Sequence, residues 1–164
     1  MDQQPSLLVT DTNIWIDLDN GGILIKVFRL PYKLVSPDIA IKELIRPTWR
    51  SLQKMGLEFV ELQPRLVLEL SQLLGIYPYL STIDLASYLL ARELNGVLLT
   101  GDRHLQQLAT LNGVSTHGSI WVLDEMIRLE ILTPKTAGEA LRRIIEQGAR
   151  LPAEECKKRL ALWG

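Results

Sequence analysis

Short apolar runs alternate along this chain with stretches of helical spacing, and this alternation is the feature that most limits the possible folds. Five runs are typical of strands, the last of them weakly: LLVT (7–10), KLVS (33–36), LEFVEL (57–62), GVLLT (96–100) and GVST (113–116). Their apolar character is continuous, as in strands that are covered on both faces. The alternation therefore predicts a parallel sheet with helices on both sides.

Helical spacing follows the strands and then takes over the chain. The patterns that follow strands are ILIKVFRL (23–30), PDIAIKELI (37–45), RLVLELSQLL (65–74), IDLASYLLAREL (83–94) and HLQQLATL (104–111). Beyond the fifth strand only helical patterns remain, at 119–132, 134–147 and 152–163. We find no linker or internal repeat, so we expect one domain over residues 1–164. Its α/β core would span about 6–117, and a helical extension would span about 118–164.

Composition and short motifs exclude several classes of protein. The formal charge of −1 argues against a protein that coats nucleic acid, although local patches can still bind phosphates. The single cysteine, Cys156, excludes an internal disulfide or a cysteine cluster for zinc. Neither a G-x-G-x-x-G after the first strand nor a G-x-x-x-x-G-K occurs, so no nucleotide cofactor is expected. The segment MDQQPS lacks the features of a signal peptide, and no run is long enough to span a membrane, so we expect a cytoplasmic protein.

Four acidic residues stand after predicted strands or near the starts of helices. Asp11 follows the first strand, and Asp102 follows the fourth. Asp84 stands at the start of the helical pattern at 83–94, and Glu43 lies in the helical pattern after the second strand. Each has an ordinary explanation. Asp11 and Asp102 could cap the next helix, Asp84 fits a capping box with Ser81, and Glu43 could face solvent.

In a parallel sheet the carboxyl ends of all strands lie at one edge, so these acids would lie along that edge. Ligands of open parallel sheets bind beyond the carboxyl ends of the strands. Two carboxylates about 4 Å apart repel by roughly 4 kcal/mol at an effective dielectric near 20. A cluster must therefore take up protons or hold a cation. Oxygen ligands favour Mg²⁺ or Mn²⁺, which would polarise a phosphodiester and lower the pKa of a water molecule that attacks phosphorus.

The four acids and their surroundings resemble, in order and spacing, the acidic motifs of the PIN domain. The motifs are LLVTDTNIWID, SPDIAIKEL, STIDLASYLLAREL and VLLTGDRHLQQLA. That family comprises metal-dependent ribonucleases, including the VapC-type toxins of bacterial and archaeal toxin–antitoxin pairs. The resemblance covers about residues 6–117, and HGSIWVLDEMI resembles a PIN subgroup with C-terminal helices.

The resemblance implies a three-layer α/β/α sandwich that cuts RNA with Mg²⁺ or Mn²⁺. The metal ligands, partly through water, would be Asp11, Asp84 and Asp102. Glu43 would complete the acidic pocket and help to orient the attacking water. The polar residues that hold a carboxylate or a water would be Thr12, Asn13 and Thr100. Homodimers are common in the family, and a toxin would have an antitoxin protein as its partner.

Basic and aromatic residues near these motifs are candidates for contacts with RNA. They are Arg46, Arg50, Lys54 and His104 for phosphates, and Trp49 and Tyr77 or Tyr79 for base stacking, although Trp49 could equally be a core residue. Charged helix faces more often only face water, so each of these residues could instead simply be exposed to solvent.

The chain departs from the family pattern after the fourth aspartate. Many relatives carry another acid or an aromatic residue there, where this chain has RHL (103–105).

Two other functions compete with the nuclease. A PIN-like domain can be an inert module that binds RNA or protein, and a failure to bind metal would favour that alternative. A haloacid-dehalogenase-like phosphatase also begins with a strand and an aspartate and uses a late Gly-Asp pair. Such phosphatases resemble D-x-D at the first motif, whereas this chain has D-T-N with Asn13 in the third place.

Overall fold

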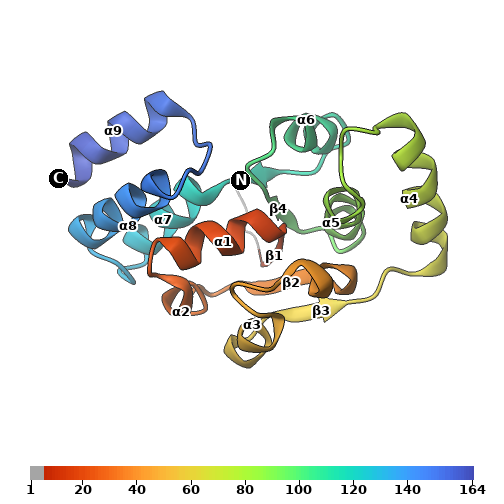
Figure 1. Cartoon of the computed structure of the whole chain (residues 1–164), viewed down its shortest axis with the longest axis horizontal. Helices are drawn as coiled ribbons and strands as arrows, with labels where there is room; N and C mark the ends of the chain where they lie inside the picture. The colour runs from red at the N-terminus through yellow and green to blue at the C-terminus, as the bar shows by residue number, and fades with distance from the viewer. Residues whose placement is uncertain (1–5) are drawn as a thin grey trace.

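The protein contains one five-stranded parallel sheet with the strand order β3-β2-β1-β4-β5 (Figure 1). The computed structural model describes residues 6–164, so most of MDQQPS, on which the signal-peptide expectation rests, lies outside the described residues. The strands are β1 Leu7–Thr10, β2 Lys33–Pro37, β3 Glu58–Val60, β4 Val97–Leu99 and β5 Thr116–His117. Every pair of neighbouring strands is parallel, as the alternating pattern of the sequence predicts.

Helices connect the strands and then continue beyond β5. Those within the α/β part are α1 Thr12–Asn20, α2 Leu24–Val27, the 3₁₀ helix η1 Asp38–Glu43, α3 Trp49–Met55, α4 Pro64–Ile76, α5 Thr82–Glu93 and α6 Arg103–Leu111. The helices after β5 are α7 Ser119–Arg128, α8 Pro134–Glu146 and α9 Ala153–Trp163. Within residues 6–164, no helix is both long and apolar enough to cross a membrane.

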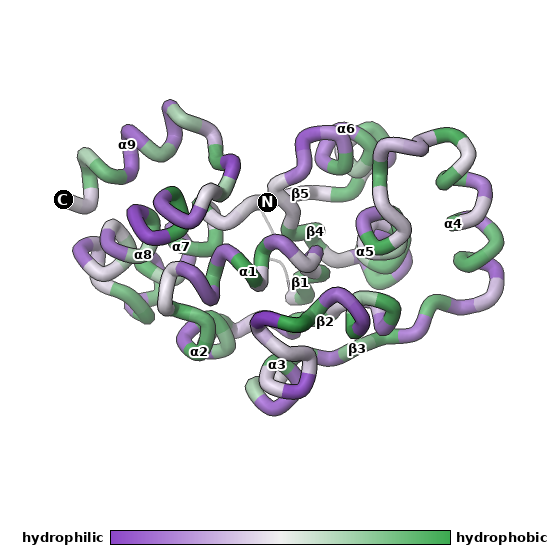
Figure 2. Tube along the Cα trace, viewed as in Figure 1, coloured by the Kyte–Doolittle hydropathy of each residue, from purple (hydrophilic) through white to green (hydrophobic). Residues whose placement is uncertain are grey.

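Both faces of the sheet are buried, which explains the continuous apolar runs. Successive residues of a strand point to opposite faces. Leu8 of β1 and Leu99 of β4 join a core with residues of α1, α2, α7 and α8. Val9 joins a second core with residues of α4, α5 and α6. The strands at the centre of the molecule are accordingly green in Figure 2. This arrangement confirms the predicted three-layer α/β/α sandwich.

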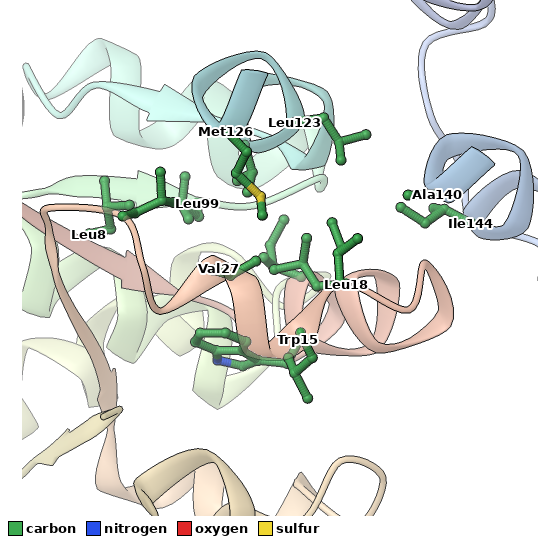
Figure 3. Packing of buried hydrophobic residues seen from close by; sticks show 14 of the residues in the cluster. Leu8, Trp15, Leu18, Val27, Leu99, Leu123, Met126, Ala140 and Ile144 are labelled. Carbon is green, nitrogen blue, oxygen red and sulfur yellow. The ribbon is translucent and has the colours of Figure 1, made fainter. Parts of the chain in front are cut away.

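The helices that follow β5 pack against α1 rather than standing apart from the core. Figure 3 shows Leu123 and Met126 of α7, and Ile144 of α8, directed toward the side of α1 that carries Leu18. Helices α1 and α8 approach closely at Gly21, which directly follows α1. A Cβ added to Gly21 would lie 3.1 Å from the Cδ1 atom of Ile144 in α8. The α/β part and the helices α7 and α8 therefore share one hydrophobic core.

Two segments fold differently from their sequence patterns. The pattern at 23–30 forms only the four-residue helix α2, and Ile25 within it is 70% exposed. The longer helix after β1 is α1, which begins directly after Asp11. The pattern at 37–45 forms the 3₁₀ helix η1, which places Glu43 at its last position.

The order of the strands creates a topological switch point between β1 and β4. From β1 the chain proceeds outward to β2 and β3, and it then returns through α4 and α5 to β4 on the other side of β1. The connections that leave β1 and β4 therefore diverge. Such a point leaves a crevice at the carboxyl ends of the two strands, where open α/β sheets bind their ligands.

Candidate active site

Asp11 lies buried at the switch point, where β1 ends and α1 begins. It is 2% exposed, and its Oδ1 atom accepts a hydrogen bond of 3.0 Å from the backbone N–H of Ile14. Its Oδ2 atom accepts a short hydrogen bond from the hydroxyl of Thr100, the residue that follows β4. Asp11 is therefore a helix cap, as the sequence allowed, and it is also tied to the neighbouring strand.

The pKa of Asp11 is raised from 3.8 to about 7. Burial is the main cause, since it penalises the charged carboxylate. The hydrogen bonds from Thr100 and from the backbone of Ile14 act in the opposite direction and lower the pKa. The negative charges of Asp84 and Asp17 raise it further, so both lie within electrostatic range. A carboxylate in this environment takes up a proton near neutral pH unless a cation compensates its charge.

Thr100 connects Asp11 to the fourth predicted acid. While its hydroxyl donates to Asp11, the same oxygen accepts a hydrogen bond of 3.1 Å from the backbone N–H of Asp102. Asp102 caps α6, because its Oδ1 atom accepts a 3.0 Å bond from the N–H of Leu105. The structure thus brings Asp11 and Asp102 together at the switch point through one completely buried hydroxyl.

Asp84 approaches the site from α5, which packs across β1 and β2. Its carboxylate accepts a 3.1 Å bond from the N–H of Ser81, and the hydroxyl of Ser81 accepts a 3.0 Å bond from the N–H of Asp84. This confirms the predicted capping box. The charge of Asp84 also raises the pKa of Asp11, so Asp84 caps α5 and still lies near the other acids at this edge of the sheet.

Glu43 is less closely associated with the other acids. It is exposed at the end of η1, which leaves the carboxyl end of β2. Among residues 6–164, no hydrogen bond or ion pair joins its side chain to Asp11, Asp84 or Asp102. The structure therefore places Glu43 at the same edge of the sheet but does not draw it into the network around Thr100.

The residues present fit a hydrated hard cation better than a directly chelated one. In the part of the chain that the structure describes, no three Asp, Glu, His or Cys side chains are placed to hold one metal ion together. The available donors are oxygens, and the buried hydroxyl of Thr12 has no hydrogen-bond partner within residues 6–164. Mg²⁺ usually keeps several waters and binds through one or two carboxylates. Asp11 with Asp84 or Asp102 satisfies that requirement, and a bound water would satisfy Thr12.

Asp17 and Ser119 form a polar contact beside the site that the sequence motifs did not predict. The Oγ atom of Ser119, at the start of α7, donates a 3.1 Å hydrogen bond to Asp17 on α1, and burial raises the pKa of Asp17. A signal for this site was present in the sequence. Asn13, Asp17 and Asn20 stand at positions i, i+4 and i+7, so they form a polar stripe on the same side of a helix whose buried residues are Ile14, Trp15 and Leu18.

The residues predicted to contact RNA fall into two groups. Arg46, Arg50 and Lys54 are exposed on the segment from η1 to α3, and the guanidinium of Arg50 lies 5.2 Å from the ring centroid of Trp49. His104 is exposed in the first turn of α6, next to Asp102. Its ring centroid lies 4.9 Å from that of Tyr79, which precedes α5 and is 61% exposed. The second group forms an aromatic pair beside the acidic edge.

A cleft of about 1010 Å³ opens beside Asp102. Its walls come from α1, the start of α6, the start of α7, and the connection between α8 and α9. Asn13 and His104 line it, as do the newly found Asp17 and Ser119. Asp102 therefore belongs both to the Thr100 network and to the cleft.

Comparison with known protein families agrees with this architecture. A family model described as PIN domain matches residues 7–164, which include the helices after β5 as well as the sheet. Searches of curated proteins and of solved structures found no significant match. PIN domains are generally nucleases and typically use divalent metals, so the match supports a nuclease-type hydrolase. From the match over nearly its whole length, together with its fold, the chain belongs to the PIN-domain family.

Proposed function

We propose that this protein is a Mg²⁺- or Mn²⁺-dependent endoribonuclease that hydrolyses phosphodiester bonds of RNA at the acidic edge of its sheet. The observation that carries the proposal is the Thr100 bridge. It holds Asp11 and Asp102 together at the switch point, while Asp84 lies close enough to raise the pKa of Asp11. Helix capping explains each of these acids separately, but it does not require that the charge of Asp84 should oppose that of the buried Asp11.

The acids of the site would have distinct roles. Asp11, Asp84 and Asp102 would hold the cation, partly through water. A bound Mg²⁺ or Mn²⁺ supplies charge stabilisation to a phosphodiester and lowers the pKa of an attacking water. Thr100 would fix the carboxylate of Asp11 through its hydrogen bond, and Thr12 and Asn13 would orient water. Glu43, being exposed, would act on the water only when substrate brings it into the pocket.

RNA as the substrate is supported by the aromatic pair and the exposed cations. Tyr79 and His104 present rings beside Asp84 and Asp102, and exposed rings of this kind stack unpaired bases. Arg46, Arg50 and Lys54 would guide the backbone from the other side. We further propose a cytoplasmic protein that forms homodimers and serves as the toxin of a toxin–antitoxin pair, with an antitoxin protein as its partner. These last features rest on the family resemblance.

Two observations keep an inert RNA- or protein-binding module as the second candidate. No three acids among residues 6–164 are placed to hold one ion, and burial raises the pKa of Asp11 to about 7, so part of its population is protonated at neutral pH. Metal binding therefore separates the two candidates. A nuclease must bind Mg²⁺ or Mn²⁺ at the acids, whereas the module has no need to do so.

The test is cleavage of a mixed pool of structured and unstructured RNA in Mg²⁺ or Mn²⁺, with EDTA and Asp84→Asn as paired controls. Asparagine keeps an oxygen that can accept the Ser81 N–H, so the capping box should survive. Cleavage that disappears in both controls would support the nuclease. If no cleavage occurs and calorimetry detects no Mn²⁺ binding, the binding module becomes the better account.

A further inference from the structure

The cleft beside Asp102 is built jointly by the α/β part and by the helices after β5. The connection between α8 and α9, at 147–152, forms one wall, and the start of α6 forms another. In Figure 1 this connection lies on the side of α1 that faces α6. At about 1010 Å³ the cleft is at the upper end of the volumes that hold small ligands, roughly 300–1,000 Å³. It can therefore admit a nucleotide-sized group.

The wall at 147–152 is anchored on both sides. Before it, α8 packs into the shared core through buried residues such as Ile144. After it, Arg159 of α9 makes a two-pronged contact with Asp124 of α7, with its Nη2 and Nε atoms 2.9 Å and 3.0 Å from the carboxylate oxygens. Gly138 of α8 and Trp163 of α9 also lie in close contact. The position of this wall is consequently set by tertiary packing.

The charges that line the cleft leave two arginines available to a ligand. Glu155 is paired with Arg159 at 2.9 Å, and Asp17 accepts the hydrogen bond from Ser119. Arg103 and Arg150 also line the cleft, and both are exposed. Neither has an acidic partner within residues 6–164. Guanidinium groups in this situation are suited to binding phosphate.

We propose that the α8–α9 connection forms part of the RNA-binding surface, in which Arg150, opposite Arg103, binds a backbone phosphate next to the one that is cleaved. This inference rests on the proposed nuclease function. Asp102 lines the same cleft, so an RNA strand that reaches the acids can continue into it. Arg150 is a binding residue and takes no part in the chemical step. Its loss should raise KM and leave kcat nearly unchanged.

The experiment compares RNA affinity in full-length proteins that carry Asp84→Asn, so that the RNA stays intact. A short single-stranded RNA with a fluorescent label is titrated in Mg²⁺ at several KCl concentrations. Arg150→Gln should weaken binding by about three- to tenfold and reduce the slope of log K against log[salt] by about 0.7, the value for one lost phosphate contact. Arg150→Lys should restore most of both, because it keeps the charge.

Arg142→Gln is the matched control. Arg142 is an exposed arginine of α8 that does not line the cleft, so its replacement should leave affinity and slope unchanged. The proposal is overturned if Arg150→Gln binds like its parent, or if Arg142→Gln weakens binding as much. Cleavage of RNA by the wild type separates a failure of the nuclease proposal from a failure of the proposed role of Arg150. If the wild type cuts RNA while Arg150→Gln binds normally, only the cleft assignment falls. If the wild type neither binds nor cuts RNA, both fall.

Discussion

Thr100 donates a hydrogen bond to the buried carboxylate of Asp11, although the two residues are 89 positions apart in the chain. The contact joins the ends of β1 and β4, the two strands that flank the switch point. The same hydroxyl receives the N–H of Asp102, so it fixes the relative positions of two acids on different helices. Because all three groups are buried or half-buried, changes here should affect stability and activity together.

We expect Asp11→Asn to stabilise the metal-free protein at high pH. The pKa of Asp11 is about 7 in the folded state, whereas an aspartate in an unfolded chain has its ordinary value of 3.8, so the folded state binds the proton more tightly. This stabilisation is complete below about pH 4 and is lost as the pH rises through 7, at a cost on the order of 4 kcal/mol by about pH 8. Asparagine remains neutral and can still accept the Ile14 N–H.

The measurement is urea unfolding of both proteins in EDTA at about pH 5 and about pH 8. The variant should be the more stable one at the higher pH, and the difference should shrink toward the lower pH. Saturating Mg²⁺ should stabilise the wild type more than the variant. Equal pH dependence of the two unfolding free energies would mean that Asp11 does not titrate as its burial indicates.

We expect Thr100→Val to damage the site more than Thr100→Ser. Valine leaves the carboxylate of Asp11 and the N–H of Asp102 without their shared partner, which should cost about 1–3 kcal/mol of unfolding free energy. Because the lost bond lowers the pKa of Asp11, the acidic limb of the rate–pH profile should also move to higher pH. Serine keeps the hydroxyl and should keep the wild-type profile. A profile that is the same for valine and serine would exclude this role for the hydroxyl.

We expect Tyr79→Ala to weaken the binding of single-stranded RNA, because the ring beside His104 would no longer stack a base. Stacking of one base contributes about 1–3 kcal/mol, so affinity should fall by about 5- to 150-fold. Tyr79→Phe keeps the ring and should bind nearly as well as the wild type. Ile76→Ala removes another exposed apolar side chain from the same region and serves as the control. Equal affinities for all four proteins would remove the aromatic pair from the binding surface.

We expect Ile144→Ala to destabilise the whole chain rather than only its C-terminal helices. Ile144 is completely buried between α8 and α1, so its truncation should cost about 2–5 kcal/mol. The neighbouring Ile145 is 37% exposed, and Ile145→Ala should cost much less. Urea unfolding followed by tryptophan fluorescence and by circular dichroism should show one coincident transition. Separate transitions would show that the helices after β5 fold as an independent unit.

Local sequence patterns account for most elements of this fold. Continuous apolar runs such as 7–10 and 96–100 predict strands that are buried on both faces, and such strands imply two helical layers. The capping chemistry of Ser81 with Asp84 likewise depends on residues three positions apart. The patterns were less reliable at 23–30 and 37–45, where the structure contains only a four-residue helix and a 3₁₀ helix.

The sequence by itself therefore determined the α/β/α class and the positions of the acids at strand ends and helix starts, because these depend on neighbours along the chain. Only the tertiary structure decided that β1 lies beside β4, since strand order depends on how distant helices cover the sheet. That order brings Thr100 to Asp11 and leaves Glu43 outside their network. The same long-range packing places Ser119 against Asp17 and Arg150 in the cleft beside Asp102. No local pattern encodes these pairings, because their partners meet only when the layers have assembled.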